Sequence, residues 1–172
     1  VLDGADTLML SGETSVGNYP IEVIKSMQSI IDATEKMPSV YNYEHEPKVF
    51  NRSFLAESIC YNAYNMARQA NANAIITFTN SGYTAFRISS HRPNAEIFAF
   101  TRNRKILRQL SLLWGVRAFY FNPFNDINEA IEQSIKILLK HELIFHNDIV
   151  VHVGSIPVQV QGAANIIKLS YV

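Results

Sequence analysis

The stretch AIITFTNSGYTAFRISS, residues 74–90, joins one apolar run to a second through a polar loop. The run at 74–78 is short and uncharged and predicts a buried strand. The segment after the loop TNSGYT predicts a short helix that ends at about Ser90. A strand, a loop with a glycine and a helix, in this order, are typical of α/β folds, so this stretch decides the fold class.

The same alternation extends on both sides of this unit. The predicted helices are 55–70, 104–113 and 127–138, and the further predicted strands are 96–101, 116–121, 148–153 and 166–172. In the first of these helices the predicted apolar stripe is Leu55, Ile59, Met66 and Ala70, with Ala56, Ala63 and Ala67 small enough for close approach to a sheet. The last helix follows a capping box of Asp126 and Glu129. We therefore predict an open, mostly parallel α/β sheet with helices on both faces over residues 53–172.

The final strand is predicted as a half-exposed antiparallel edge strand, because apolar and polar residues alternate along it. The alternating residues are Ile167, Leu169 and Tyr171 against Lys168 and Ser170.

The first 52 residues form a separate unit. The apolar run ADTLML at 5–10 predicts a buried strand, and a loop follows it. Pro20 at a first helical position begins a predicted helix that ends near Glu35 and carries a stripe of isoleucines. Residues 36–52 show no period and contain two prolines, which predicts a linker. The absence of an initiator methionine indicates a chain that begins inside a longer protein or was processed.

The composition excludes several classes of function. Apolar residues make up 48% and charged residues 17% of the 172 residues, and the formal net charge is +0, so no footprint for nucleic acid or an anionic membrane is expected. No apolar run approaches the length of a membrane span, and the start of the chain lacks the basic region of a signal peptide. The single cysteine, Cys60, excludes an internal disulfide, fits a cytoplasmic protein and is expected to pack in the core. No histidine stands at zinc-binding spacing, and solvated or core-edge histidines are expected.

Two loops carry candidate functional residues. The first is Ser11-Gly12-Glu13-Thr14, and its alternative interpretation is an ordinary polar loop. The second is Thr79-Asn80-Ser81-Gly82-Tyr83-Thr84, between a strand and the start of a helix. Helix N-termini bind phosphate through unpaired N–H groups, and Gly82 lets the backbone approach an anion closely. A plain helix cap is the alternative for this loop, and the residue chemistry alone favours it. Arg87 is expected to be the only charge near the loop.

Several motifs resemble the C-terminal portion of the pyruvate kinase family. Residues 3–20, DGADTLMLSGETSVGNYP, are similar to the segment that forms the last strand and following loop of that family's catalytic barrel. Four further motifs are similar, in order, to its C-terminal domain: TNSGYTA at 79–85, HRPN at 91–94, RQLSLLWGV at 108–116 and NDIVVHVG at 147–154. The resemblance covers essentially the whole chain.

The resemblance implies a cytoplasmic homotetrameric enzyme that transfers phosphate from phosphoenolpyruvate to ADP with Mg²⁺ and usually K⁺. Residues 1–35 would be the last βα unit of its TIM barrel, and residues 53–172 its allosteric and oligomerisation domain. A barrel takes about 250 residues, and the catalytic lysine and magnesium carboxylates come from strands that this sequence lacks. Ser11 and Glu13 would lie near the parent's active site. This fragment is therefore expected to be inactive alone, with no catalytic residue, metal or cofactor of its own. A stand-alone phosphometabolite-binding or oligomerisation module is the alternative.

The resemblance also implies that Thr79–Thr84 binds a phosphorylated effector. Three features depart from the family. Tyr83 stands where many relatives have a basic residue, Ala164 precedes Asn165 where relatives often have threonine, and residues 118–128 contain no lysine or arginine. A monophosphate, or no effector, is therefore expected rather than a sugar bisphosphate. Without its barrel neighbours, segment 5–10 is expected to be poorly ordered or to make a non-native contact.

Overall fold

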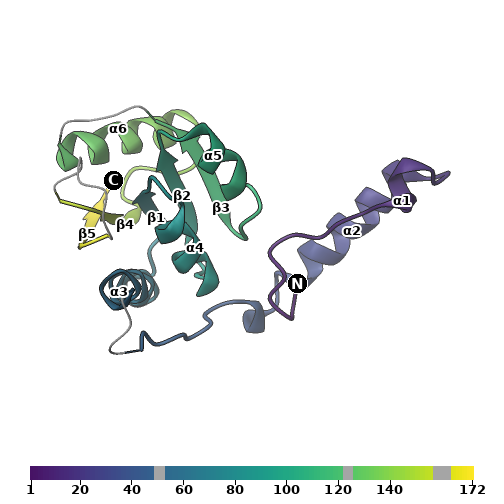
Figure 1. Cartoon of the computed structure of the whole chain (residues 1–172), viewed down its shortest axis with the longest axis horizontal. Coiled ribbons are helices and arrows are strands. Elements are labelled where there is room, and N and C mark those ends of the chain that lie inside the picture. Colours follow the sequence, from purple (N-terminus) through teal and green to yellow (C-terminus); the bar gives the residue numbers. More distant parts are fainter. Residues whose placement is uncertain (49–52, 122–125, 157–163) are drawn as a thin grey trace.

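A computed structural model of the chain describes residues 1–48, 53–121, 126–156 and 164–172. It shows an α/β domain from which an N-terminal arm projects (Figure 1). The arm contains α1 (Gly12–Ser15) and α2 (Pro20–Thr34), followed by a short 3-10 helix, η1 (Pro38–Val40). The domain contains, in order, α3 (Phe54–Ala70), β1 (Ala74–Phe78), α4 (Tyr83–Ser90), β2 (Glu96–Thr101), α5 (Arg104–Leu110), β3 (Val116–Tyr120), α6 (Ile127–Lys140), β4 (Ile149–Gly154) and β5 (Ile166–Tyr171).

The five strands form one sheet in the order β3-β2-β1-β4-β5. All neighbours are parallel except β4 and β5, which are antiparallel. The chain runs from β1 outward to β2 and β3 and then returns through α6 to β4, on the other side of β1. The order therefore reverses between β1 and β4, which makes this pair of strands the topological switch point of the sheet. The predicted fold class is confirmed.

Helices cover the sheet on both faces. On one face, Ile97 packs with Cys60 of α3 and Ile88 of α4, and the next inward residue, Ala99, packs with Leu110 of α5. On the other face, Phe98 and Phe100 of β2 pack against Leu138 of α6. The alternation of side chains along β2 thus separates two cores, as expected for a strand buried on both sides.

The face that α3 buries agrees with the predicted alanines, and of the predicted stripe Ile59 and Met66 pack against the core whereas Leu55 does not. The predicted alanines Ala56, Ala63 and Ala67 are buried, together with Cys60 and Tyr64, whereas Leu55 is 73% exposed. Small residues on this face bring the helix backbone close to the sheet, so the largest apolar side chains do not mark the contact. The predicted packing role of Cys60 is confirmed, and burial raises the pKa of its thiol to about 12.

The predicted alternation along β5 is only partly reflected in burial. β5 is an antiparallel edge strand, as expected, but Leu169 and Tyr171 are exposed, the second by 74%. Ser170, predicted on the polar side, instead lies 3.0 Å from Nε2 of the buried His152. An edge strand covered on one face only leaves its other side chains without a packing surface.

The arm corrects one prediction. Residues 5–10 form no strand and are largely exposed, with Met9 at 88%, because no other described strand lies beside them to accept hydrogen bonds and cover their side chains. The predicted helix is confirmed as α2, which begins at Pro20. No residue of α2 is fully buried in the described part of the chain, and Ile21, Ile24 and Ile30 are more than half exposed.

A cluster around Arg92 joins the arm to the domain. The Arg92 side chain is 2% exposed, and its guanidinium lies 4.7 Å from the Trp114 ring centroid. Its Nη2 donates to the Ala5 carbonyl at 2.9 Å and lies 3.4 Å from a carboxylate oxygen of Asp6. Trp114 in turn donates from its indole nitrogen to Glu35 at 2.9 Å. We call these five residues, Ala5, Asp6, Glu35, Arg92 and Trp114, the arm junction.

The described part of the predicted linker is docked rather than free. Val40 is fully buried, and Tyr41 packs edge-on to the Trp114 ring. Beyond it, the backbone N–H groups of Asn42 and Tyr43 donate to the carbonyls of Arg92 and His91, at 2.8 and 2.9 Å. Residues 49–52 of this segment lie outside the described residues.

His152 makes stability depend on pH. The expectation of solvated or core-edge histidines is wrong for His91 and His152, which are both 1% exposed. Burial, with a smaller contribution from the charge of Lys168, lowers the pKa of His152 from 6.5 to about 4. The unfolded chain therefore takes up a proton below about pH 6.5, while the folded chain stays neutral to about pH 4. Stability that is present above pH 6.5 is lost as the pH falls through this window.

We expect the substitution His152→Gln to flatten the pH dependence of unfolding. Between pH 7 and pH 5 the titration of His152 removes roughly 2 kcal/mol of stability from the wild type, and glutamine removes this contribution. Urea unfolding at pH 7, 6 and 5 measures the slope. His146→Gln, at an exposed position, is the control and keeps the wild-type slope. Equal slopes in all three proteins would show that His152 is free to charge in the folded state.

Candidate functional site

The loop Thr79–Thr84 lies at the carboxyl end of β1, beside the switch point between β1 and β4. Open α/β sheets bind ligands in the crevice at this place, because the loops that leave the two strands diverge to opposite faces. The Thr79 N–H donates to the Phe100 carbonyl at 3.0 Å, which fixes the start of the loop to β2. The predicted strand-loop-helix arrangement is confirmed here.

Hydrogen bonds within the loop hold its shape. The Gly82 N–H donates to the Thr79 hydroxyl oxygen at 2.9 Å, and the Tyr83 N–H to that of Ser81 at 3.4 Å. Gly82 has φ +83, a left-handed conformation that glycine adopts without strain. The side chains of Thr79 and Ser81 therefore accept from the N–H groups of Gly82 and Tyr83, while the N-cap residue of α4, Gly82, makes no side-chain cap hydrogen bond.

The hydrogen bonds to Thr79 and Ser81 leave two backbone N–H groups at the start of α4 without an intrahelical acceptor. In the first turn, the N–H groups of Thr84 and Ala85 have no intrahelical acceptor, because helical bonding begins with Phe86, whose N–H donates to the Gly82 carbonyl at 2.9 Å. Asn80 and Ser81 are exposed, whereas the Thr84 side chain is buried. An anion at this point would be held by backbone N–H groups and the Ser81 hydroxyl, with Thr84 contributing its N–H.

The cation that contacts the loop is Arg102. Its Nε donates to the Asn80 side-chain oxygen at 3.2 Å, from the segment that follows β2. The expectation that Arg87 is the only nearby charge is wrong, and Arg87 instead lies 3.6 Å from Glu57 of α3. Glu57 also accepts from the Tyr83 hydroxyl at 3.2 Å, so Tyr83 and Arg87 are both directed toward α3. Arg102 therefore supplies the positive charge that the loop itself lacks.

The other candidate loop is folded into a short helix. Residues Gly12–Ser15 form α1, and the Ser11 N–H donates to a carboxylate oxygen of Glu13 at 2.9 Å. Hydrogen bonds from the backbone N–H groups of Glu13 and Ser11 hold the pKa of Glu13 below its usual value. Thr14 donates from its hydroxyl to the Ser11 carbonyl at 3.2 Å. The polar groups of this segment thus satisfy one another in the present structure.

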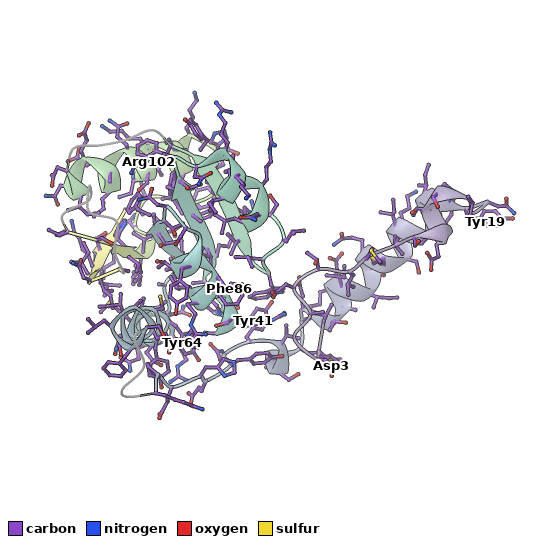
Figure 2. The ribbon with its side chains drawn as sticks, in the orientation of Figure 1. Asp3, Tyr19, Tyr41, Tyr64, Phe86 and Arg102 are labelled. Carbon is purple, nitrogen blue, oxygen red and sulfur yellow. The ribbon has the colours of Figure 1, made fainter. Side chains whose placement is uncertain are left out.

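The two candidate loops are not brought together. α1 lies at the tip of the arm, far from the sheet (Figure 1), and Figure 2 shows Tyr19 at that tip while Tyr41 lies beside the domain. Within the ranges that the structure describes, no group of three or more His, Cys, Asp or Glu side chains could hold a metal ion. In the same ranges, no helix combines the length and apolar character needed to cross a membrane.

The described ends of the segment after β4 are joined by hydrogen bonds. At its base, the N–H of Ile156 donates to the Asn165 side chain at 2.8 Å, and Asn165 donates back to the Ile156 carbonyl at 2.8 Å. Ala164 is buried beside this clamp. Residues 157–163, and residues 122–125 of the predicted cation-free segment 118–128, lie outside the described residues.

Two functional features were not foreseen from the sequence. Arg102 could have been found, because it follows the strand 96–101 and the carboxyl ends of parallel neighbours meet at one edge of the sheet. The arm junction had no such signal, since it connects residues as far apart as Ala5 and Arg92.

An open, mostly parallel α/β sheet with a strand-loop-helix unit beside its switch point defines the class as a doubly wound α/β domain. The family model "Pyruvate kinase, alpha/beta domain" matches residues 57–170. The chain belongs to this family.

Individual relatives agree with this assignment. The chain is similar to the pyruvate kinase of Clostridium acetobutylicum, with 32% identity over 172 residues, 100% of this chain and 36% of that protein. It is similar to the pyruvate kinase of Corynebacterium glutamicum, with 34% identity over 169 residues, 98% of this chain and 34% of that protein. The crystal structure of Cryptosporidium parvum pyruvate kinase superposes with a TM-score of 0.78 at 26% identity, over 99% of this chain and 33% of that one. The chain thus spans about a third of the length of these relatives.

We expect Gly82→Ala to destabilise the domain more than Gly115→Ala. Both glycines have positive φ, so each alanine costs about 1 kcal/mol in backbone strain. At Gly82 the new Cβ would also lie 3.2 Å from Cγ2 of Ile106, whereas nothing lies within 4 Å at Gly115. This contact adds roughly 1 kcal/mol or more. Urea unfolding measures the difference, and equal losses would show that α5 does not pack tightly on the loop.

Proposed function

We propose that this chain is the regulatory part of a pyruvate kinase, the enzyme that transfers phosphate from phosphoenolpyruvate to ADP, and that it does not catalyse alone. The N-terminal arm supports this assignment. Its α2 exposes Ile21 and Ile24, by 63% and 56%, on one apolar helix. Exposed apolar surface of this kind marks a contact with another part of a protein. We infer that the missing segments of the catalytic barrel cover this surface in the full enzyme.

The contact between Arg102 and the loop Thr79–Thr84 is the observation that most supports phosphate binding. It places a guanidinium beside exposed Asn80 and Ser81 and near the free N–H groups of α4. These are the groups that bind a phosphate in proteins. One cation supports a single phosphate, so we propose a phosphorylated metabolite with one phosphate as the effector, bound with modest affinity.

α4 provides a route from this loop to the arm. The helix has Gly82 at one end and His91 at the other, with Arg92 next along the chain. Arg92 and His91 hold the docked segment through their carbonyls, and Arg92 holds the arm through Ala5. We propose that a phosphate that shifts the start of α4 also shifts the arm junction, and through it the segment that carries Ser11 and Glu13. These two residues would then respond to the effector without contacting it.

The remaining properties follow from the family and are proposals for this chain. We expect the parent enzyme to be a cytoplasmic homotetramer, with this domain contributing to contacts between subunits. We expect Mg²⁺ and K⁺ to bind to barrel segments that this sequence does not include, together with the catalytic lysine. The fragment itself is then a phosphometabolite-binding and oligomerisation unit.

Phosphate binding is expected to raise the melting temperature. A ligand at a hundred times its dissociation constant adds about 2.7 kcal/mol of stability, which corresponds to a shift of about 5–10 °C for a chain of this size. Thermal melts with phosphate, ribose 5-phosphate and fructose 1,6-bisphosphate measure it, with the bisphosphate no better than the monophosphate. Ser81→Asp places a carboxylate where the anion would bind and is expected to abolish the shift. Equal shifts in both proteins would leave the loop as a plain helix cap.

The isolated chain is expected to show no phosphoenolpyruvate-dependent phosphorylation of ADP. Phosphoryl transfer depends on positioned cations and metal ions, which the family places on the missing barrel strands. A coupled assay with Mg²⁺ and K⁺ measures it, with a complete pyruvate kinase as the positive control. Turnover that rises in proportion to the concentration of the pure chain would contradict the proposed division of labour.

A further inference from the structure

A groove between α4 and α5 lies beside the loop but on the side away from the switch point. Its volume is about 530 Å³. Eight residues line it: Ser81, Gly82, Tyr83, Phe86, Ile106, Gln109, Leu110 and Leu113. This volume is in the range of pockets that bind small organic molecules. The family assignment does not use the groove, which shares Ser81, Gly82 and Tyr83 with the loop proposed to bind phosphate.

The walls of the groove are mainly apolar. Phe86 is 47% exposed on the α4 side, and Ile106, Leu110 and Leu113 form the α5 side. The Tyr83 ring lines the groove while its hydroxyl donates to Glu57 of α3 at 3.2 Å. Gln109 contributes an exposed amide group at the rim. Aromatic side chains on one wall and aliphatic ones on the other favour a flat apolar body.

The segment that forms the groove is rich in cations, although the whole chain is neutral. Residues 58–125 contain eight lysines and arginines and a single acid, Glu96, while Glu57 of α3 accepts from the Tyr83 hydroxyl. Glu96 lies 3.4 Å from Arg117 on the neighbouring strand. At the loop end of the groove, Arg102 is fixed by its bond to Asn80. Lys105 lies one helical turn before Gln109, on the same side of α5. Neither Arg102 nor Lys105 has an ion-pair partner among the described residues.

We propose that this groove binds an aromatic organic anion, with its ring between Phe86 and the leucines of α5 and its carboxylate or phosphate at Arg102 and Lys105. An apolar ring gains from removal of Phe86 and Ile106 from water, and the anion gains from two unpaired cations. The groove shares Ser81 and Gly82 with the phosphate loop. The ligand's anion would contact the same Arg102 as a phosphate at the loop, so occupancy of the groove lowers phosphate affinity at the loop.

Titration of the ¹⁵N-labelled 172-residue chain with 2-naphthoate tests the proposal by NMR. The expected result is saturable shifts of the amides of Gly82, Phe86, Ile106 and Gln109, with a dissociation constant of about 0.1–1 mM. The neutral analogue 2-naphthamide is expected to bind at least fivefold more weakly, and 2-naphthyl phosphate at least as tightly as the carboxylate. Inorganic phosphate alone tests the loop: shifts of residues 79–85 without shifts of Ile106 and Gln109 report phosphate at the loop and not in the groove.

Three variants locate the binding. Gln109→Trp, at an exposed helix position, fills the groove and is expected to weaken 2-naphthoate at least tenfold. Lys105→Glu is expected to weaken it at least threefold. Lys136→Glu makes the same charge change on α6, on the other face of the sheet, and is expected to have no effect. The ¹⁵N spectra of the variants confirm that each is folded.

Several results would overturn the proposal. These are the absence of saturable shifts with 2-naphthoate, equal binding of the acid and the amide, or equal weakening by Lys105→Glu and Lys136→Glu. A fourth is a dimer, detected by sedimentation velocity, that Gln109→Trp dissociates, because the groove would then hold a second copy of the chain. If the wild-type chain binds 2-naphthoate but shows no shifts with inorganic phosphate, the proposed effector loop is refuted and the groove is supported.

Discussion

β1 is hydrogen-bonded on both edges, to β2 and β4, and its residues Ala74–Thr77 are buried between helices on both faces. A strand in this position meets water only at its ends. Polar groups that contact a ligand must therefore lie just beyond the end of the strand. The loop Thr79–Thr84 occupies that end. Its geometry is set by the neighbouring strand, through Thr79 and Phe100, and by α5, through the close approach of Ile106 to Gly82.

The arm junction holds the projecting arm to the domain through few contacts. A desolvated guanidinium over an indole ring contributes about 2 kcal/mol, and the charge-assisted bond from Arg92 to the Ala5 carbonyl adds to it. Arg92 holds this position with φ +47, an uncommon conformation for a residue with a side chain. Its second terminal nitrogen, Nη1, is buried without a partner among the described residues. A strained backbone and an unsatisfied donor together indicate a position selected for the connection rather than for stability.

The sequence predicted the sheet well, because strands such as 74–78 and 96–101 are apolar runs between loops with clear turn residues. It failed for 5–10, since an apolar run becomes a strand only if other strands pair with it, and no neighbouring strand is present in the described chain. The buried face of α3 was predicted except at Leu55, which is 73% exposed although it is larger than the alanines that make the contact. Of the loop residues, Thr79 and Ser81 accept hydrogen bonds from the loop backbone and Gly82 has a positive φ, while their binding of phosphate stays a prediction. Arg102 was missed because its contact with Asn80 spans 22 residues and depends on the pairing of β1 with β2.

The concentration of positive charge in residues 58–125 has a consequence for the molecule as a whole. Because the net charge is +0, the rest of the chain carries a compensating excess of acids. Three cations of this segment pair with acids outside it, in Arg68–Glu44, Arg87–Glu57 and Arg92–Asp6. Exposed ion pairs weaken as salt rises, since the Debye length is about 8 Å at 0.15 M ionic strength. The attachment of the arm and of the segment before α3 to the domain is therefore partly electrostatic and loosens as salt is added.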